Sequence, residues 1–319
     1  MNCQAKYRDR LPQQSGKLFL TDGGMETTLI YHDGIDLPCF AAFTLLKTPE
    51  GTQRTRRYYA RYATMARQAG LGFVLESPTW RANADWGAKL GYSRADLAEA
   101  NRQGIALMAE LRAQFETAQS PMVISGVIGP RGDGYDPSRI MTADEAQTYH
   151  AEQIATYRET AADLVSAFTM NYVNEAIGIA RAAQAARMPV VISFTVETDG
   201  RLPTGETLKE AITHVDEATA SAPVYYMINC AHPTHFRDAL TAGESWVKRI
   251  GGLRANASKR SHAELEQATE LDAGDPVEFG REHAALRRML PHVTVLGGCC
   301  GTDHRHVEQI MFTCAPIAA

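Results

Sequence analysis

The sequence predicts a single (β/α)8 barrel, an α/β fold, and two observations carry this prediction. Short apolar or β-branched runs alternate with longer helical patterns, which is typical of βα units on a parallel sheet. The chain has 319 residues, a length that suits one such barrel of about 250 residues or more. We therefore expect one barrel domain over residues 1–319, with residues 1–16 as a polar N-terminal leader.

Eight runs have the apolar and β-branched content of strands. They span residues 18–21, 72–76, 121–128, 164–169, 189–196, 224–230, 248–256 and 293–296. The clearest is 189–196, PVVISFTV, a continuous apolar run that suits a strand buried on both faces.

Helical patterns follow these strands, and several have explicit start signals. Pro49 suits the first turn of a helix. Thr142–Glu145 and Ser261–Glu264 are capping boxes, in which the first and fourth residues bond each other's backbone. Further helical stretches are expected at 96–116, 174–187 and 207–220, after 232–233, and from 303 onward.

An open, doubly wound sheet is the main alternative fold. It would need a glycine-rich phosphate loop after an early strand, and Asp22-Gly23-Gly24-Met25-Glu26 lacks the GxGxxG spacing. The sequence also lacks a P-loop and a cobalamin-binding region. The closed barrel is therefore favoured.

Composition excludes several classes of function. The formal net charge of −5, without a basic stripe, argues against a nucleic-acid or anionic-membrane partner. The N-terminus has no apolar segment of a secretory signal, and no uncharged apolar run reaches about 18 residues. We therefore expect a cytoplasmic protein whose six cysteines are reduced.

Polar residues follow directly on the apolar runs, where a barrel has its active site. These residues are Asp22, Glu76, Thr169, Glu197, Cys230, Asn256, Cys299 and Cys300. In a closed barrel the sixth and eighth strands are only one strand apart. The three thiols at their ends can therefore converge on one point.

The paired cysteines indicate a metal site. Adjacent residues of a regular strand point to opposite faces, but Gly297-Gly298-Cys299-Cys300-Gly301-Thr302 has glycines that let the backbone turn. Three thiolates select zinc, and a catalytic zinc keeps its fourth position open. The alternatives are a redox pair, simple packing, or a structural zinc with a histidine ligand. The candidate histidines are His232, His235, His304 and His306, and the other thiols, Cys3, Cys39 and Cys314, are interpreted as ordinary.

Such a zinc would bind an incoming thiol and hold it as the thiolate. A thiolate held in this way is nucleophilic toward a methyl group on a cationic sulfur or nitrogen. The cysteine pattern therefore predicts alkyl transfer by in-line displacement.

Several motifs in this order resemble the homocysteine S-methyltransferase family, over residues 18–312. They are Asp22-Gly23-Gly24, Gly34-Ile35-Asp36-Leu37, Ile128-Gly129-Pro130, Ile192-Ser193-Phe194-Thr195, Ile228-Asn229-Cys230 and Gly297-Gly298-Cys299-Cys300-Gly301-Thr302. The family includes betaine– and S-methylmethionine–homocysteine methyltransferases. The resemblance implies a (β/α)8 fold, zinc on Cys230, Cys299 and Cys300, and Asp22 as a ligand of the homocysteine amino group. Asn256 matches a family asparagine near the end of the seventh strand.

One departure concerns the fourth strand. The family usually ends this strand with a glutamate that contacts the substrate amino group, whereas Phe168 stands at that position here. The loss of a carboxylate removes an opposite charge from an ammonium site. We therefore hypothesise that Glu76 or Glu197 takes over the ammonium contact.

A cationic methyl donor would be attracted to aromatic faces. Aromatic candidates follow the first three strands: Phe40, Phe43, Trp80, Trp86 and Tyr135. We expect the donor to be of the S-methylmethionine, S-adenosylmethionine or betaine type, and homocysteine to be converted to methionine. Another small thiol acceptor, or a non-catalytic zinc- and thiol-binding partner of a corrinoid protein, are the alternatives. A homo-oligomer is compatible with the sequence.

Overall fold

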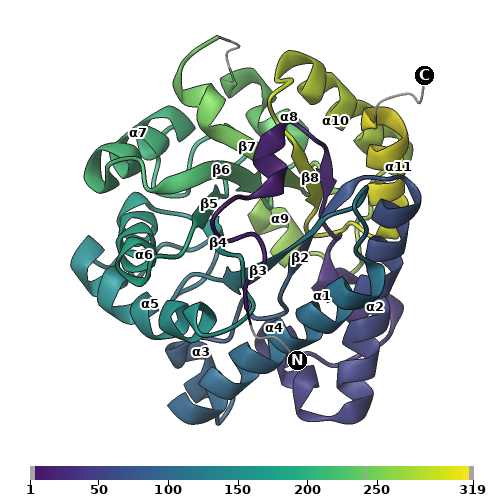
Figure 1. The fold of residues 1–319 in the computed structure, drawn as a ribbon. Helices are drawn as coiled ribbons and strands as arrows, with labels where there is room; N and C mark the ends of the chain where they lie inside the picture. The colour runs from purple at the N-terminus through teal and green to yellow at the C-terminus, as the bar shows by residue number, and fades with distance from the viewer. Residues whose placement is uncertain (1–3, 241–242, 316–319) are drawn as a thin grey trace.

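The computed structural model describes residues 4–240 and 243–315, and it confirms the predicted (β/α)8 barrel. Eight parallel strands pair in chain order, and β1 closes the barrel on β8 (Figure 1). The strands are β1 (Phe19–Leu20), β2 (Gly72–Glu76), β3 (Met122–Ile128), β4 (Leu164–Met170), β5 (Val190–Phe194), β6 (Pro223–Asn229), β7 (Ile250–Ala255) and β8 (Val295–Gly298).

Helices surround the barrel, as Figure 1 shows. They are α1 (Met25–Thr27), α2 (Pro49–Gln68), α3 (Ala84–Lys89), α4 (Arg94–Phe115), α5 (Ala143–Arg158), α6 (Val173–Ala186), α7 (Leu208–Thr219), α8 (Pro233–Phe236), α9 (His262–Glu266), α10 (Pro276–Met289) and α11 (His304–Cys314). Both predicted capping boxes are present, at Thr142 before α5 and Ser261 before α9. Pro49 opens α2, as predicted.

The observed elements differ from the prediction mainly at their ends. The seventh strand begins at Ile250, because Lys248 and Arg249 belong to a 3-10 turn (Trp246–Arg249). The helices α1, α3 and α10 are additional to those predicted. The helix α1 continues into one turn of π-helix, Thr28–His32, and π turns are frequent at functional sites.

Strand residues alternate between two hydrophobic layers, as the period of two requires. Phe19, Val74 and Val295 belong to one cluster, which also contains residues of β3 to β6. Their neighbours Leu20 and Phe73 belong to the larger cluster that includes the helices. The strands are thus buried on both faces, and their C-terminal ends are fixed relative to one another.

Residues 4–16 of the N-terminal leader cover the N-terminal end of the barrel, where their dark ribbon crosses in front of the strands (Figure 1). Leu11 packs with Phe19 and Val295 in the interior cluster. The backbone N–H groups of Lys6 and Tyr7 both donate to Asp163 Oδ1 at 2.7 Å. Cys3 lies outside the described residues.

Arg112 also binds Asp163 at this N-terminal end of the barrel. Its Nη1 donates to Asp163 Oδ2 at 2.7 Å, and the Ile124 N–H donates to the same oxygen at 2.8 Å. Asp163 is fully buried, so each of its oxygens needs a partner, and each has two. This Arg112–Asp163 pair joins α4, β3, β4 and the leader.

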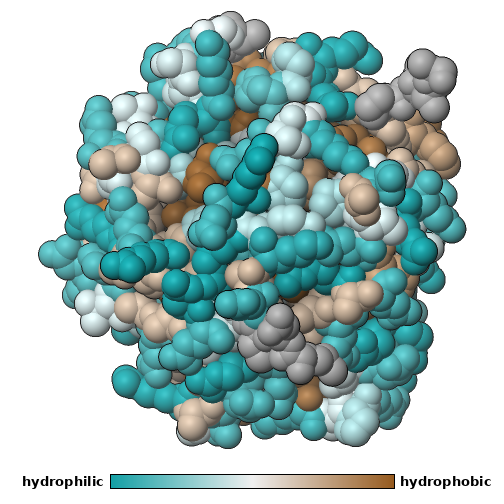
Figure 2. All heavy atoms as spheres, viewed as in Figure 1, coloured by the Kyte–Doolittle hydropathy of each residue, from teal (hydrophilic) through white to brown (hydrophobic). Residues whose placement is uncertain are grey.

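The surface in the same view is mostly hydrophilic, with apolar residues in small areas between polar ones (Figure 2). Among the described residues, no helix is both long enough and apolar enough to cross a membrane.

Candidate metal and acceptor site

Three thiols converge at the C-terminal end of the barrel. Cys230 directly follows β6, and Cys299 and Cys300 directly follow β8. The three sulfurs lie within 4.8 Å of one another, and the Sγ atoms of Cys230 and Cys300 are 3.8 Å apart. The predicted convergence of the three thiols is therefore present in the fold.

Backbone geometry brings these thiols together. Cys230 has a left-handed φ of 54°, which turns its side chain out of the β6 direction. A Cβ on Gly298 would lie 2.1 Å from the Thr302 hydroxyl oxygen, so only glycine fits there. Gly301 has a φ of 78°, a conformation that favours glycine. These two glycines let Cys299 and Cys300 face the same point.

The donor set fits a soft metal ion. Three thiol sulfurs within mutual reach at the mouth of a pocket match the ligand type that zinc prefers and leave a fourth position for substrate. In the part of the chain that the structure describes, no histidine or carboxylate joins this group.

The four candidate histidines have other partners. His232 accepts from the Thr234 N–H as the cap of α8, and His235 contacts the Lys259 carbonyl. His304 contacts Arg61, and His306 contacts the Ala273 carbonyl. Each of the four is therefore engaged outside the thiol group.

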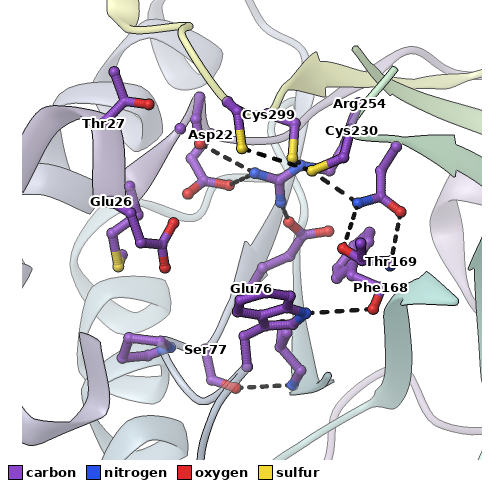
Figure 3. A pocket seen from close by; sticks show the side chains of 18 of the residues that line it. Asp22, Glu26, Thr27, Glu76, Ser77, Phe168, Thr169, Cys230, Arg254 and Cys299 are labelled. Carbon is purple, nitrogen blue, oxygen red and sulfur yellow. Dashed lines mark hydrogen bonds and ion pairs between the residues drawn. The ribbon is translucent and has the colours of Figure 1, made fainter. Parts of the chain in front are cut away.

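A buried arginine, absent from the residues singled out in the sequence, lies beside the thiols. Arg254 projects from β7 between two acids at neighbouring strand ends, as Figure 3 shows. Its Nη2 lies 3.0 Å from Asp22 Oδ1, and its Nη1 pairs with Glu76 Oε2. Its Nε donates to the Gly298 carbonyl at 3.0 Å and its Nη2 to the Gly23 carbonyl at 3.1 Å.

Arg254 thus neutralises one of two buried carboxylates and holds both in place. Asp22 is 3% exposed and Glu76 is 4% exposed, so each requires a compensating charge or hydrogen bond. Burial raises the pKa of Asp22, while the Arg254 charge and the Tyr58 hydroxyl, 2.8 Å from Asp22 Oδ2, act in the opposite direction.

Arg254 also affects the thiols. The pKa of Cys299 lies well below its usual value, first because the Cys230 and Cys300 thiols bond to it, and further because Arg254 is close. The Arg254 charge therefore favours the thiolate form within this group, and thiolates are the form that binds metals.

Phe168, where the sequence comparison expects an acid, lies in the pocket lining near the end of β4. The strand pairing shifts between Ala167 and Met170, and Thr169 has a left-handed φ of 63°. Asn229 holds this bulge, because its Oδ1 accepts from the Thr169 N–H at 2.9 Å. The Arg254 guanidinium lies 5.2 Å from the Phe168 ring centre. An apolar face therefore lies next to the guanidinium at this strand end.

A second residue that the sequence reading missed is Glu26 of α1. It lines the pocket, and its carboxylate points across it toward the side of Asp22 and Glu76 (Figure 3). Burial, together with the nearby Cys299 and Asp22, raises the pKa of Glu26 to about 7. The signal in the sequence was weak, because Glu26 sits in a three-residue helix.

The other two predicted site residues lie outside the pocket lining. Glu197 Oε1 is 3.2 Å from His262 Nδ1, and His262 Nε2 is 2.6 Å from the Cys230 carbonyl oxygen. Asn256 is buried just after β7, and its N–H donates to the Ala231 carbonyl at 3.0 Å. Both therefore adjoin the backbone around Cys230.

Of the aromatic candidates, Trp80 and Tyr135 line the pocket. The Tyr135 hydroxyl lies 3.8 Å from Cys300 Sγ, and the Trp80 Nε1–H donates to the Phe168 carbonyl at 3.3 Å. Phe40 is exposed, and Phe43 packs on Tyr92 in the core.

Comparison with known protein families shows which family the chain belongs to. The profile described as homocysteine S-methyltransferase matches residues 19–313. The chain belongs to the homocysteine S-methyltransferase family. It is accordingly a methyltransferase enzyme, and the resemblance drawn from its motifs is confirmed.

Solved structures of another protein share the fold of this family member. The homocysteine methyltransferase MmuM from Escherichia coli, in its oxidized form, has 19% identity and a TM-score of 0.71, covering 94% of this chain and 97% of that one. Its metallated form has 17% identity and a TM-score of 0.72, covering 94% and 96%.

Proposed function

We propose that this family member is a zinc-dependent enzyme that moves a methyl group from a small sulfonium or ammonium donor to the thiol of homocysteine, giving methionine. The observation that carries the proposal is the group of three thiols, Cys230, Cys299 and Cys300, at the mouth of the barrel pocket. That MmuM is a homocysteine methyltransferase with a metallated form supports it. Bound zinc would supply a thiolate at neutral pH.

The acceptor thiol would release its proton to solvent when zinc binds it, so the reaction balances without a further base. A lone pair on the acceptor sulfur forms the new bond to the methyl carbon, and the bond from that carbon to the donor's cationic atom breaks. Its electron pair stays on the donor, which leaves as a neutral sulfide or amine. Two opposite charges disappear, so the step is favoured in a pocket with restricted access to water.

The residues around the pocket would position both substrates. The pair of acids held by Arg254, Asp22 and Glu76, would orient the polar end of the acceptor. Trp80 and Tyr135 offer aromatic faces to an onium donor of the S-methylmethionine, S-adenosylmethionine or betaine type. Glu197 would act through His262, and Asn256 through the backbone beside Ala231, to fix the turn at Cys230.

A different small thiol as acceptor is the second candidate. Phe168 at the acid position, with Arg254 over its ring, is the observation that favours it. A panel of thiols, each offered with methyl-labelled donors, separates the two candidates. The first predicts that homocysteine has the highest kcat/KM.

The test of the proposal combines this panel with a cysteine variant. Zinc-loaded wild-type protein should transfer label to homocysteine, whereas Cys300→Ser should lose both zinc and transfer. Cys39→Ser is the matched control, because Cys39 lies outside the thiol group, and it should retain both. Transfer that requires a methylcobalamin carrier, with no small donor active, would contradict the proposal and favour a partner of a corrinoid protein.

A further inference from the structure

The acids of the pocket differ in whether they are already paired. Asp22 and Glu76 share the guanidinium of Arg254. Glu26 faces the same space (Figure 3). Among the described residues, no side chain forms a hydrogen bond or ion pair with its carboxylate. The Glu26 side chain is partly buried and faces the pocket, so a cationic group of a bound ligand is its expected complement.

The position of Glu26 is fixed with respect to the thiols. The Gly301 N–H, in the turn that carries the paired cysteines, donates to Thr27 Oγ1 at 3.0 Å. The Gly24 N–H donates to the Thr302 carbonyl at 3.1 Å. A Cβ on Gly24 would lie 2.5 Å from the Cys299 carbonyl oxygen, so the chain before α1 packs directly on this turn.

This docking favours the acceptor over the donor as the partner of Glu26. The acceptor sulfur must lie at the thiol group, so groups a few bonds from that sulfur lie close to the Cys299–Thr302 turn and to α1. In-line displacement places the donor's cationic atom on the far side of the methyl carbon from the acceptor sulfur, so the onium group lies farther from the thiol group than the acceptor does. The aromatic residues Trp80 and Tyr135, rather than α1, offer surfaces suited to an onium group.

We propose that Glu26 binds the ammonium group of the acceptor, and that the enzyme thereby selects aminothiols over thiols that lack an amino group. Asp22 and Glu76 are already paired with Arg254. Phe168 stands where the family resemblance places an acid. Glu26 of α1 is therefore the acid available to bind the ammonium group. This inference rests on the proposed function, because it assumes a thiol bound at the three cysteines.

The test measures binding separately from turnover. Zinc-loaded wild type, Glu26→Gln and Glu50→Gln are titrated calorimetrically with homocysteine and with γ-mercaptobutyrate, which is homocysteine without its amino group. Glu50 is an exposed acid on α2 and serves as the matched control. Kinetic constants for acceptor and donor are then measured on the same proteins.

We expect wild type and Glu50→Gln to prefer homocysteine by about tenfold or more, the usual effect of one charge-assisted hydrogen bond. Glu26→Gln should lose that preference, with a higher acceptor KM and an unchanged donor KM. An unchanged preference in Glu26→Gln, or a change in the donor KM alone, would overturn the inference.

The failure of the two proposals can be told apart. If the thiols bind with the expected selectivity but no methyl group is transferred, the inference stands and the proposed reaction fails. If homocysteine is methylated and Glu26→Gln does not alter the selectivity, the reaction stands and the inference fails. If neither thiol binds to the zinc-loaded wild type, both are wrong.

Discussion

Two buried arginine–carboxylate groups lie at opposite ends of the same barrel, and they differ in charge balance. At the N-terminal end, Arg112 meets one acid, Asp163, whose two oxygens accept four hydrogen bonds from backbone and side chain. At the C-terminal end, Arg254 meets two acids, Asp22 and Glu76, in a pocket that also holds Glu26 and three thiols.

The comparison distinguishes the Arg112–Asp163 ion pair, which stabilises the fold, from the Arg254 group, which can bind a ligand. Both oxygens of Asp163 already accept two hydrogen bonds each, so this carboxylate has nothing left to offer a substrate. The group around Arg254 has more acids than cations and faces a cavity. Ionisable groups with shifted pKa values are often arranged in this way at functional sites. The same residue types therefore stabilise the fold at one end and prepare a site at the other.

The largest expected effect is on stability at the saturated pair. Arg112→Met leaves the Asp163 charge buried without its cation, so the free energy of unfolding should fall by about 3–5 kcal/mol. Urea unfolding measures this, with Arg102→Met, an exposed arginine on the same helix, as the control expected to change it by less than about 1 kcal/mol. If both variants lose the same free energy of unfolding, the Arg112–Asp163 pair does not have the structural role given to it here.

Arg254→Met should act mainly on function. Asp22 and Glu76 are buried, but they line a pocket that water can enter once the guanidinium is removed, so the loss of stability should be smaller than for Arg112→Met. The acids lose their fixed orientation, and kcat/KM for the acceptor should fall by about 10–100-fold, as for other residues that orient ligands. If Arg254→Met keeps full activity but loses much stability, Arg254 serves the fold, as Arg112 does, and not the substrate.

The smallest effect is expected at Glu197. This acid is 36% exposed, pairs with His262 and lies outside the pocket lining, so Glu197→Gln should leave the acceptor KM within about twofold of wild type. Glu76→Gln, within the Arg254 group, should raise it more. A larger effect at Glu197 than at Glu76 would support Glu197 as the ammonium ligand.

Much of this architecture is readable from the sequence, because it depends on local signals. The apolar runs predicted all eight strands, and the glycines around Cys299 and Cys300 predicted the turn that brings the thiols together. Topology then brings Cys230 beside them, since β6 and β8 are separated by one strand.

Arg254 and Glu26 were missed for different physical reasons. Arg254 sits in the seventh predicted strand, and its role depends on acids more than 170 residues away along the chain. Between Ile250 and Ala255 the chain is apolar apart from Arg254, and this single charge was the available signal. Glu26 points into the pocket only because α1 docks on the turn at Gly301, a tertiary contact that no local pattern reports.

The most direct test of the central claim is X-ray absorption at zinc on the purified protein, with and without homocysteine, alongside Cys299→Ser. We predict about one zinc per chain with three sulfur ligands, a further sulfur when homocysteine is added, and loss of the metal in the variant. A protein that binds no zinc, or a zinc shell that homocysteine leaves unchanged, would contradict the account.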